Sequence, residues 1–439
     1  MNYNEIIQRE KVRYIDVKYI DLLGRLRHVT LPLERLPAVM ERGIGIDGSS
    51  LPGFKGHEAS DMKLMIDTES AFLDPLFEEM TLSFLSSIHV VQGDRRFSDD
   101  PKYVLNKAVN AICSKTGAGK AVFQPELEFY LFSAIDRDET DLSSFYSLEP
   151  IEDSRPYGSY HAALPGDHTA NLRNRISSVL SDVGIRVKYH HHEGGAYSQV
   201  EIELNPEEAE KVADWIVIAK YIIKGLALQE NLIATFMPKP VNGHPGSGLH
   251  LHQYLADENG CSLFADNDSD DGLSELAKYY IGGLLAHIGS LTALTNPSTN
   301  SFRRLKTGFE SPEKVDYSVA DRTCAIRIPG YASKNEIRIE YRVPDATSNP
   351  FLAMAALLMA GLDGIERKLD PEDVKKSNPR IPCSLNEALE GLRKDHDYLL
   401  KDGVFTESLL ENWIEIKGKE AADIESRVHP HEFVYYFEV

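Results

Sequence analysis

The sequence predicts an α+β protein with two domains, a small β-rich one at residues 1–98 and a larger one at residues 99–439. Three observations predict this. Strand-like runs make roughly the first 95 residues β-rich. A helical pattern begins at Pro101, directly after two aspartates. Beyond it, strand patterns alternate with long helical patterns, and their mixed polarity leaves the order of the strands open.

The first domain is predicted to contain strands at residues 12–20 and 25–33 and a short helix at residues 33–42. A glycine-rich stretch follows at residues 43–56 and contains the letters GIGIDG. A dinucleotide-binding loop needs a strand before this motif and a helix after it, and neither pattern is present. We therefore expect no dinucleotide site there.

The second domain is predicted to begin with a helix at residues 103–112, whose apolar residues fall on one face. The letters TGAGKA at residues 116–121 lack the defining positions of a phosphate loop and are interpreted as the turn that ends this helix. Strands are expected at residues 121–132, 197–204, 248–255, 323–329 and 335–343. Helices are expected at residues 171–183, 208–230, 275–295, 349–368 and 384–396, the last with a capping box formed by Ser384 and Glu387.

The composition excludes several classes of function. The 439 residues include 47 Lys+Arg and 68 Asp+Glu, and the formal net charge of −21 argues against a nucleic-acid partner. No apolar run approaches the ~18 residues of a membrane span, and the N-terminus has no signal-peptide pattern, so we expect a cytoplasmic protein with no membrane partner. The four widely spaced cysteines predict neither a zinc site nor a disulfide. A small anionic substrate is compatible if a metal or arginines reverse the charge locally.

Charged residues are predicted to share strand faces. Glu126 and Glu128 lie two positions apart, so both side chains project from the same face of their strand. By the same alternation Glu201 accompanies Gln199, and one face of a third strand presents two histidines, His250 and His252. For any one of these strands, a solvated sheet face is the alternative interpretation.

A fourth strand presents Arg338, Glu340 and Arg342 on one face. With Glu193, which follows three histidines, these strands supply five carboxylates and one imidazole. A ligand set rich in oxygen suits Mg²⁺ or Mn²⁺ better than zinc or copper. Carboxylate-held metals that face guanidinium groups are typical of phosphoryl transfer. Arginines crowd the C-terminal third, at positions 303, 304, 322, 327, 338 and 342.

Taken in order, these residues resemble the glutamine synthetase family, as a divergent member of its bacterial and archaeal type I class. The resemblance covers nearly the whole chain from Asp47 to the C-terminus. It implies an N-terminal β-grasp-like domain and a catalytic domain with a mainly antiparallel, curved sheet flanked by helices. The matching motifs are DGSS at 47–50, SDM at 60–62, PELEF at 125–129, HHE at 191–193, QVEI at 199–202, GSGLHLHQ at 246–253, NSFRRLKTGFESP at 300–312, DRTCAIRIP at 321–329 and IEYRVPDATSNPFLAMAALLMAGLDGI at 339–365.

The resemblance also implies an activity. A glutamate–ammonia ligase joins ammonia to the γ-carboxylate of L-glutamate through γ-glutamyl phosphate, and ATP, its co-substrate, is converted to ADP and phosphate. Two or more Mg²⁺ or Mn²⁺ ions are implied in each active site. One would be held by Glu128, Glu193 and Glu201, and another by Glu126, His250 and Glu340.

Substrate contacts carry over residue by residue from the same resemblance. Asp47 would take the proton from ammonium, and Glu310 would close the pocket from a mobile flap, so with Arg322 these are the expected catalytic residues. Glutamate would be bound by Gly246, Arg304, Glu310, Arg322 and Arg342. ATP would be bound by His252, Arg322, Arg327 and Arg338, and ammonium by Asp47, Asp61 and Tyr160.

The family implies a homo-oligomer, expected to be a dodecamer of two stacked hexamers in which Asp47 reaches the site of the adjacent subunit. The segment at residues 368–385 lacks the tyrosine-bearing loop that some members adenylylate. Gly56 stands where feedback-inhibited members carry an arginine. We therefore expect neither of these two controls to operate.

Several positions depart from the family pattern. Pro245 and Asp321 stand where asparagine is usual, which bears on the glutamate contacts. Near the nucleotide, Lys188, Tyr254 and Asn335 stand where glutamate, serine and lysine are common. These changes imply that the contacts to adenine and ribose are rebuilt.

Two alternatives stay open at this point. A γ-glutamyl ligase that uses a primary amine or polyamine would share the activation step and differ in its acceptor. The resemblance implies that the first domain borders the ammonium pocket, and within that domain the stretch 66–98 is divergent. Retention of the expected ammonium-pocket residues favours ammonia. A catalytically inactive relative is the second alternative. It should have lost metal ligands, whereas all six expected positions are filled.

Overall fold

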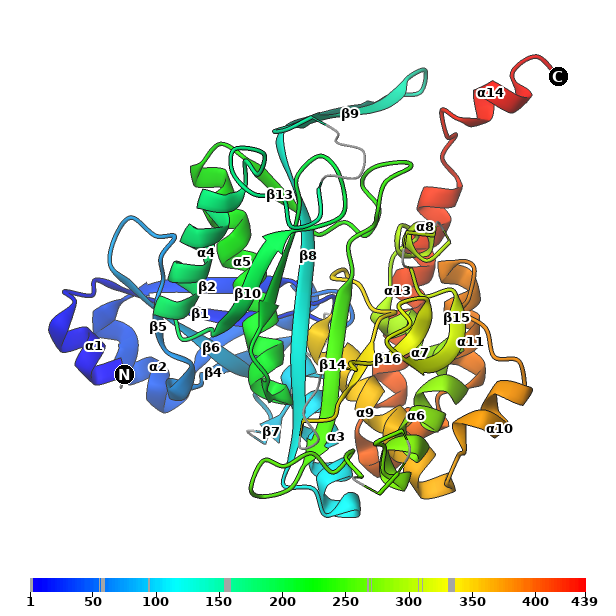
Figure 1. Cartoon of the computed structure of the whole chain (residues 1–439). Helices are drawn as coiled ribbons and strands as arrows, with labels where there is room; N and C mark the ends of the chain where they lie inside the picture. Colours follow the sequence, from blue (N-terminus) through cyan, green and yellow to red (C-terminus); the bar gives the residue numbers. More distant parts are fainter. Residues whose placement is uncertain are drawn as a thin grey trace.

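The computed structural model of the chain contains two β-sheets covered by helices (Figure 1). Glu310 and Asn335, both named from the sequence, lie outside the described residues. No helix among the described residues is both long enough and apolar enough to cross a bilayer. The described residues are 3–54, 56, 60–93, 95–153, 159–266, 268–269, 271–306, 308–309, 311–330 and 336–439.

The N-terminal sheet has the strand order β2-β1-β6-β4-β3, with β5 and β7 also paired to β6. β1 and β6 run parallel, and the other pairs are antiparallel. The strands expected near residues 12–20 and 25–33 are confirmed as β1 and β2. The elements of this domain are α1 (Tyr3–Arg9), β1 (Tyr14–Ile20), β2 (Leu26–Pro32), α2 (Leu36–Arg42), β3 (Ile44–Asp47), β4 (Asp61–Ile66), β5 (Phe72–Leu73), β6 (Thr81–Val90) and β7 (Arg95–Arg96).

The larger sheet has the strand order β10-β11-β8-β14-β17-β16-β15, with β9, β12 and β13 also paired to β8. Its pairs are antiparallel except β15 with β16, so the expected mainly antiparallel sheet is confirmed. The strands are β8 (Lys120–Glu139), β9 (Ser144–Pro150), β10 (Val187–His192), β11 (Gln199–Leu204), β12 (Glu207–Glu208), β13 (Ile233–Thr235), β14 (Leu249–Ala256), β15 (Lys314–Val319), β16 (Cys324–Ile328) and β17 (Ile339–Tyr341).

Helices flank this sheet. In the view of Figure 1, α4 and α5 lie to the left of the long cyan strand β8, and the helices of the C-terminal third lie to its right. The helices are α3 (Pro101–Thr116), α4 (Ala170–Asp182), α5 (Ala209–Gln229), α6 (Glu275–Ala286), α7 (Ile288–Thr295), α8 (Ser301–Arg304), α9 (Pro350–Arg367), α10 (Pro371–Lys376), α11 (Leu385–Lys394), α12 (Asp397–Leu400), α13 (Glu407–Glu425) and α14 (Glu432–Tyr436).

The strand predicted over residues 121–132 continues to Glu139 as β8, and two further elements differ from expectation. The single helix predicted over residues 275–295 is two helices, because the chain breaks at His287. The imidazole of His287 lies 2.9 Å from Asp363 and 2.8 Å from Asp395, and this buried contact with α9 outweighs the helical pattern. The strand predicted over residues 335–343 is confined to β17.

The helix that opens the second domain is confirmed and extends beyond the predicted residues 103–112 at both ends. Asp100 caps α3 by accepting a hydrogen bond from the Lys102 backbone N–H, and Pro101 occupies the first turn. Gly117 ends the helix in the left-handed region, at φ 72°, which glycine adopts without strain. The TGAGKA segment is therefore a helix end. GIGIDG leads through β3 into a 3-10 turn, not into the α-helix that a dinucleotide loop needs.

Helix α9 forms the centre of the hydrophobic core, and fifteen of its residues are buried. Its backbone lies against α6 at a glycine crossing formed by Gly283 and Gly364. A Cβ atom added at Gly364 would lie 2.2 Å from the Tyr279 carbonyl oxygen. The neighbouring Tyr280 donates a 2.6 Å hydrogen bond to Gln253 on β14. The crossing therefore fixes the helices to the strand that carries two of the expected site histidines.

We expect Gly364→Ala to destabilise the protein by about 2–3 kcal/mol, because the added methyl group has no space at the glycine crossing and overpacking forces the two helices apart. The measurement is the thermal midpoint of unfolding, compared with wild type in the same buffer.

Gly289→Ala on α7 is the matched control, since a Cβ added at Gly289 meets no described atom within 4 Å. Equal midpoints for the two variants would contradict the close packing of α6 on α9.

Candidate active site

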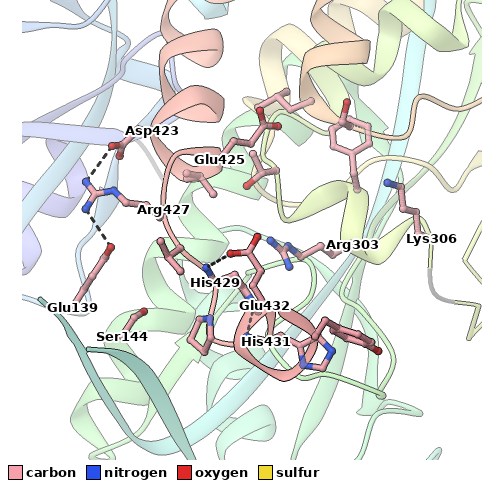
Figure 2. A pocket seen from close by; sticks show the side chains of 18 of the residues that line it. Glu139, Ser144, Arg303, Lys306, Asp423, Glu425, Arg427, His429, His431 and Glu432 are labelled. Carbon is pink, nitrogen blue, oxygen red and sulfur yellow. Dashed lines mark hydrogen bonds and ion pairs between the residues drawn. The ribbon is translucent and has the colours of Figure 1, made fainter. Parts of the chain in front are cut away.

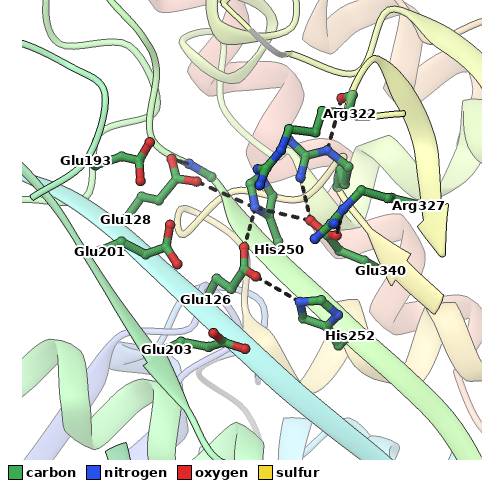
Figure 3. Close-up of polar contacts among 12 residues, drawn as sticks. Glu126, Glu128, Glu193, Glu201, Glu203, His250, His252, Arg322, Arg327 and Glu340 are labelled. Atoms are coloured by element: carbon green, nitrogen blue, oxygen red, sulfur yellow. Dashed lines mark hydrogen bonds and ion pairs between the residues drawn. The ribbon is translucent and has the colours of Figure 1, made fainter. Parts of the chain in front are cut away.

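The strand register brings the expected carboxylates and imidazoles to one face of the large sheet. Side chains two positions apart project from the same face, and residues directly opposite on neighbouring strands lie within contact distance. Figure 3 shows these side chains converging from β8, β11, β14 and β17. The residues that pair across strands are His191–Glu201, Glu201–Glu128, Glu203–Glu126, Glu126–His250, His252–Glu340 and Glu340–Arg327.

The converging side chains line a polar cavity of about 100 Å³. Carboxylates form one wall and guanidinium groups the other, as the left and right halves of Figure 3 show. The two walls would attract a cation and an anion side by side. The metal and substrate residues expected from the sequence that line it are Glu126, Glu128, Tyr160, Glu193, Glu201, Gly246, His250, Arg304, Arg322, Arg327 and Arg342, and Gln199 and Pro245 line it as well.

Glu126 is held at the centre by two imidazoles. His250 Nδ1 lies 2.7 Å from one carboxylate oxygen and His252 Nε2 lies 2.8 Å from the other. Burial raises the pKa of Glu126, but the hydrogen bonds from His250 and His252 outweigh it and hold the pKa well below its usual range. Glu126 is therefore ionised in a site from which water is largely excluded.

Among the described residues, no imidazole forms a hydrogen bond with Glu193 or Glu201. Burial, and then the negative charge of Glu128, raise the pKa of Glu193 to about 7. Burial and the charges of neighbouring glutamates raise the pKa of Glu201 well above its usual value. His191 lies 3.6 Å from an oxygen of each, and burial lowers its own pKa. At neutral pH, and without a cation to neutralise the charge, Glu193 is therefore only partly ionised and the protonated form of Glu201 is favoured.

Three groups of ligand atoms fit a divalent metal ion, with the atoms of each group within 4.8 Å of one another. The Glu193–Glu201 and Glu126–Glu340 pairs expected from the sequence fall in different groups. His191 and His252 join these pairs, although neither was expected as a metal ligand. Oxygen predominates in all three groups, as Mg²⁺ and Mn²⁺ prefer. The groups are Glu126–His252–Glu340, His191–Glu193–Glu201 and Glu126–Glu201–Glu203.

Sequence reasoning missed Glu203. Its Oε1 accepts hydrogen bonds from Gln124 and, at 2.9 Å, from Lys188. Its Oε2 is buried and receives no hydrogen bond from any described residue. The same alternation that links Gln199 to Glu201 continues to position 203 and would have found it. Lys188, which stands where glutamate is common in the family, therefore forms an ion pair with Glu203.

The opposite wall is built around Glu340, which is fully buried. Arg327 donates to it from β16, and Arg342 Nη1 donates to it at 2.5 Å. Arg342 also donates from Nε to the Arg322 carbonyl oxygen at 3.1 Å. Guanidinium groups that are fixed in this way present their remaining donors in a rigid fork, which suits carboxylate and phosphate oxygens.

Arg304 depends on two glycines. It donates to the carbonyl oxygens of Val343 at 2.8 Å and Arg342 at 3.0 Å. A Cβ atom added at Gly248 would lie 2.6 Å from Arg304 Nη2, and one added at Gly246 would lie 2.7 Å from Arg304 Cγ. Only glycine at these two positions lets the guanidinium lie beside the carboxylates.

Some expected site residues lie elsewhere. Asp47 and Asp61 pair across β3 and β4 of the N-terminal sheet, are exposed, and do not line the cavity of their own chain. Hydrogen bonds from Ser49 and Ser50 lower the pKa of Asp47 to about 2. Arg338 also lies off the cavity lining and donates to the Glu336 carbonyl oxygen at 3.4 Å.

Tyr160 lies at the cavity with its side chain more than half exposed. Its ring stacks on His161 at a centroid distance of 4.0 Å and meets the edge of His191 at 5.4 Å. Pro245, which stands where asparagine is usual, also lines the cavity, and its carbonyl oxygen accepts a 2.7 Å hydrogen bond from Tyr130. Aromatic side chains therefore border the acidic wall.

A second cavity, of about 860 Å³, lies beside the C-terminal segment (Figure 2). Arg427 there bridges Glu139 at 3.2 Å and Asp423 at 3.1 Å. Arg303 lines this cavity and not the acidic one, so it is separated from Arg304 despite their adjacency in the sequence. The lining of the two cavities has no residue in common.

Models of known protein families match both domains of the chain. A family model described as the glutamine synthetase catalytic domain matches residues 98–436, and one described as the glutamine synthetase β-grasp domain matches residues 11–90. The chain belongs to the glutamine synthetase family. The expected β-grasp N-terminal domain and α+β fold are confirmed, whereas the boundary at residue 98 stays a prediction.

Named relatives span the full length of this glutamine synthetase family member. Glutamine synthetase of Streptomyces coelicolor is 40% identical over 99% of this chain and 98% of its own, and that of Methylococcus capsulatus is 37% identical over the same shares. Among solved structures, a Plasmodium falciparum glutamine synthetase matches with a TM-score of 0.90 at 26% identity, over 99% of this chain and 98% of that one. GmaS without ligand matches with a TM-score of 0.82 at 27% identity, over 99% of each chain. The expected enzyme class, a ligase of the glutamine synthetase type, is confirmed.

We expect divalent-metal binding to this family member to strengthen as the pH rises from about 6 to 8. The raised pKa values mean that Glu193 and Glu201 hold protons in the metal-free enzyme, and these protons compete with the cation. Each proton displaced corresponds to about a tenfold change in affinity per pH unit. Titration calorimetry with Mg²⁺ in two buffers of different ionisation enthalpy measures the protons released.

The control is Glu193→Gln, which should bind Mg²⁺ more weakly and release fewer protons. In metal-free wild type, the same raised pKa of Glu193 favours folding below the unfolded value of 4.5 and loses that contribution as the pH rises through about 7. Metal affinity that is independent of pH over this range would contradict the protonated state of the acidic wall.

Proposed function

We propose that the chain catalyses the ATP-dependent ligation of ammonia to the γ-carboxylate of L-glutamate, giving glutamine, ADP and phosphate by way of γ-glutamyl phosphate. The observation that carries this proposal is the cavity with a wall of carboxylates and a facing wall of arginines. Such a cavity can hold cations and a phosphate-bearing substrate together. The identity to named glutamine synthetases over the full chain supports the same activity.

Mg²⁺ or Mn²⁺ fits the acidic wall, because the donors are mostly oxygens and Glu193 and Glu201 keep raised pKa values without a cation. We assign one ion to Glu128, Glu193 and Glu201, and another to Glu126, His250 and Glu340. His191 and His252 lie beside these two sets. When bound, the ions neutralise the negative charge that phosphate oxygens bring into the cavity.

In the first step the chain's own groups hold the γ-carboxylate of glutamate against the terminal phosphate of ATP. We assign the glutamate contacts to Gly246, Arg304 and Arg342, whose guanidinium groups are fixed by backbone carbonyls and by Glu340. Arg322, Arg327 and Arg338 would hold the phosphates, with His252 also on the ATP side. Fixed donors stabilise the charge that develops on the transferred group and limit the access of water.

In the second step ammonia attacks the acyl phosphate. We assign the capture of ammonium to Asp47, Asp61 and Tyr160, the transfer of its proton to Asp47, and closure of the site to Glu310. The low pKa of Asp47 keeps it ionised at neutral pH, which suits attraction of a cation. Its exposure on an edge strand supports the proposal that it serves the cavity of a neighbouring subunit in a ring.

Asp47→Ala and Glu128→Ala should each abolish glutamine formation, and co-assembly of the two should restore about a quarter of wild-type activity. In a mixed ring, random neighbours place an intact Asp47 beside an intact Glu128 in about one site of four. The measurement is glutamine formation by co-expressed, differently tagged variants purified through both tags.

Asp136→Ala, at an exposed position on β8, is the control for Glu128→Ala and should keep full activity. No recovery of activity in verified mixed oligomers would contradict the shared site. Unchanged ADP release by Glu128→Ala alone would contradict the metal assignment.

A second candidate function is a γ-glutamyl ligase that uses a primary amine, favoured by the match to GmaS over 99% of both chains. It requires the same activation step and differs in the acceptor pocket. The two functions are separated by the product and not by ADP release alone.

We expect efficient glutamine formation from ammonium and at least about tenfold lower kcat/KM with methylamine, ethylamine or putrescine, because a charged aspartate pair fits a bare ammonium ion more tightly than a substituted one. The measurement is ADP release with each acceptor, with products identified by mass.

The control omits glutamate, so that ATP hydrolysis is counted separately. If a γ-glutamylamide forms efficiently from an amine while glutamine forms only slowly from ammonium, the activation step stands and the acceptor is an amine, not ammonia.

A further inference from the structure

A third cavity, of about 640 Å³, lies between the two domains and shares no lining residue with the acidic one. The β1–β2 turn at residues 23–26 forms one side of it. Helix α5, the segment at residues 234–237 and the segment at residues 346–348 form the other, and α13 closes one end. We call it the basic pocket, after the charge of its lining.

Four cations line the basic pocket, and they face a single carboxylate. The cations are Arg25, Lys220, Lys224 and Lys417, and the carboxylate is Glu420. Glu420 is already paired with Lys417 at 2.8 Å. The pocket is therefore strongly positive within a chain whose formal net charge is −21. A positively charged pocket of this kind attracts anions.

Lys220 and Lys224 form no ion pair with a carboxylate of the described residues, although the charge of Asp345 acts on Lys220 from beyond ion-pair distance. Lys220 donates 2.5 Å to the Ala346 carbonyl oxygen, and both ammonium groups lie over the Phe236 ring, at 5.6 and 5.7 Å. Within the part of the chain that the structure describes, no carboxylate forms an ion pair with Lys220, Lys224 or Arg25. The nearby Asp345 is engaged by Asn296 at 2.9 Å and by Thr347 at 2.5 Å.

The two lysines also repel each other. They are four positions apart on α5, so they lie on the same face of the helix, where like charges are destabilising. Burial, and then the positive charge of Lys224, lower the pKa of Lys220 to about 8. An anion between the lysines would remove both the repulsion and the burial of an uncompensated charge.

We propose that the basic pocket binds a small oxyanion carrying two or more negative charges, a phosphorylated metabolite or a polycarboxylate. Lysine ammonium groups bind such oxyanions as point charges. Phe236, Met237 and Ala346 give the pocket an apolar floor for the carbon skeleton of the ligand. The volume accommodates a molecule of metabolite size.

The test is titration calorimetry of the full-length enzyme at neutral pH with pyrophosphate and, separately, with citrate. Wild type should bind at least one probe. Lys224→Met should weaken that binding by about tenfold or more, because each charge-assisted hydrogen bond contributes about 1.5–3 kcal/mol. Tighter binding of pyrophosphate assigns phosphorylated ligands to the pocket, and tighter binding of citrate assigns polycarboxylates.

Lys211→Met is the matched control, since Lys211 lies on the same helix, pairs with Glu207 and does not line the pocket. It should bind both probes like wild type. Any binding in the arginine-lined cavity is common to all these proteins, so the difference between them reports the basic pocket. Lys224 is exposed, and retained ligase activity verifies that Lys224→Met is folded. Absence of binding to wild type, or equal binding by wild type and Lys224→Met, would overturn the proposal.

Discussion

Carboxylates that are brought together out of water repel one another, and one face of the large sheet concentrates this repulsion. The protein reduces this repulsion in two ways. Glu126 and Glu340 are matched internally, by two imidazoles and by two guanidinium groups, and both remain ionised with lowered pKa values. Within the described part of the chain no cationic side chain donates a hydrogen bond to Glu193 or Glu201, and their raised pKa values favour the protonated forms. The site is therefore complementary to added positive charge at one wall and to added negative charge at the other. The proposed reaction requires this division of charge, because the terminal phosphate of ATP and the γ-carboxylate of glutamate, both negative, must come together and would otherwise repel each other.

A face under such repulsion keeps its geometry only if the frame behind it resists movement. The antiparallel ladder of β11, β8, β14 and β17 fixes the spacing of the acids. Helix α5 packs on β8, and α9, which has almost no exposed surface, packs against α5. The glycine crossing brings α6 close enough for Tyr280 to form a hydrogen bond with Gln253 on β14.

The N-terminal sheet is joined to this frame by buried polar contacts: Asn349 at the start of α9 donates to the carbonyl oxygens of Asp21 and Leu22. Lys18, buried between Asp16 and Asp74, reaches Tyr221 of α5 through Asp74. Rigid packing of this kind is a general requirement for precisely placed side chains.

The sequence allowed the fold class, the main helices and the shared face of Glu126, Glu128, Glu201 and His250 to be predicted, because alternation along a strand is a local property. It did not allow the strand order, since register and pairing depend on contacts between distant segments. It missed the break at His287, where a buried contact with Asp363 and Asp395 overrides a helical pattern. It missed β10, which carries three consecutive histidines and shows no alternation, and so left out His191. The residue-by-residue roles came from resemblance, which is why Asp47 could be named although it does not line the cavity of its own chain.

The pairing of β8 with β14 joins segments that are remote along the chain: His250 and Glu126, which bond at 2.7 Å, are separated by 124 positions. Closing so long a loop comes late in folding, after local helices and hairpins have formed. A divalent cation consequently meets at most the local group on the β10–β11 hairpin, His191, Glu193 and Glu201, in a partly folded chain, and finds its full ligand set once the distant strands have paired. Interactions that form after the transition state slow unfolding and leave the folding rate almost unchanged. The cation supply of the cell would thereby govern how long each folded molecule lasts, not how quickly it forms.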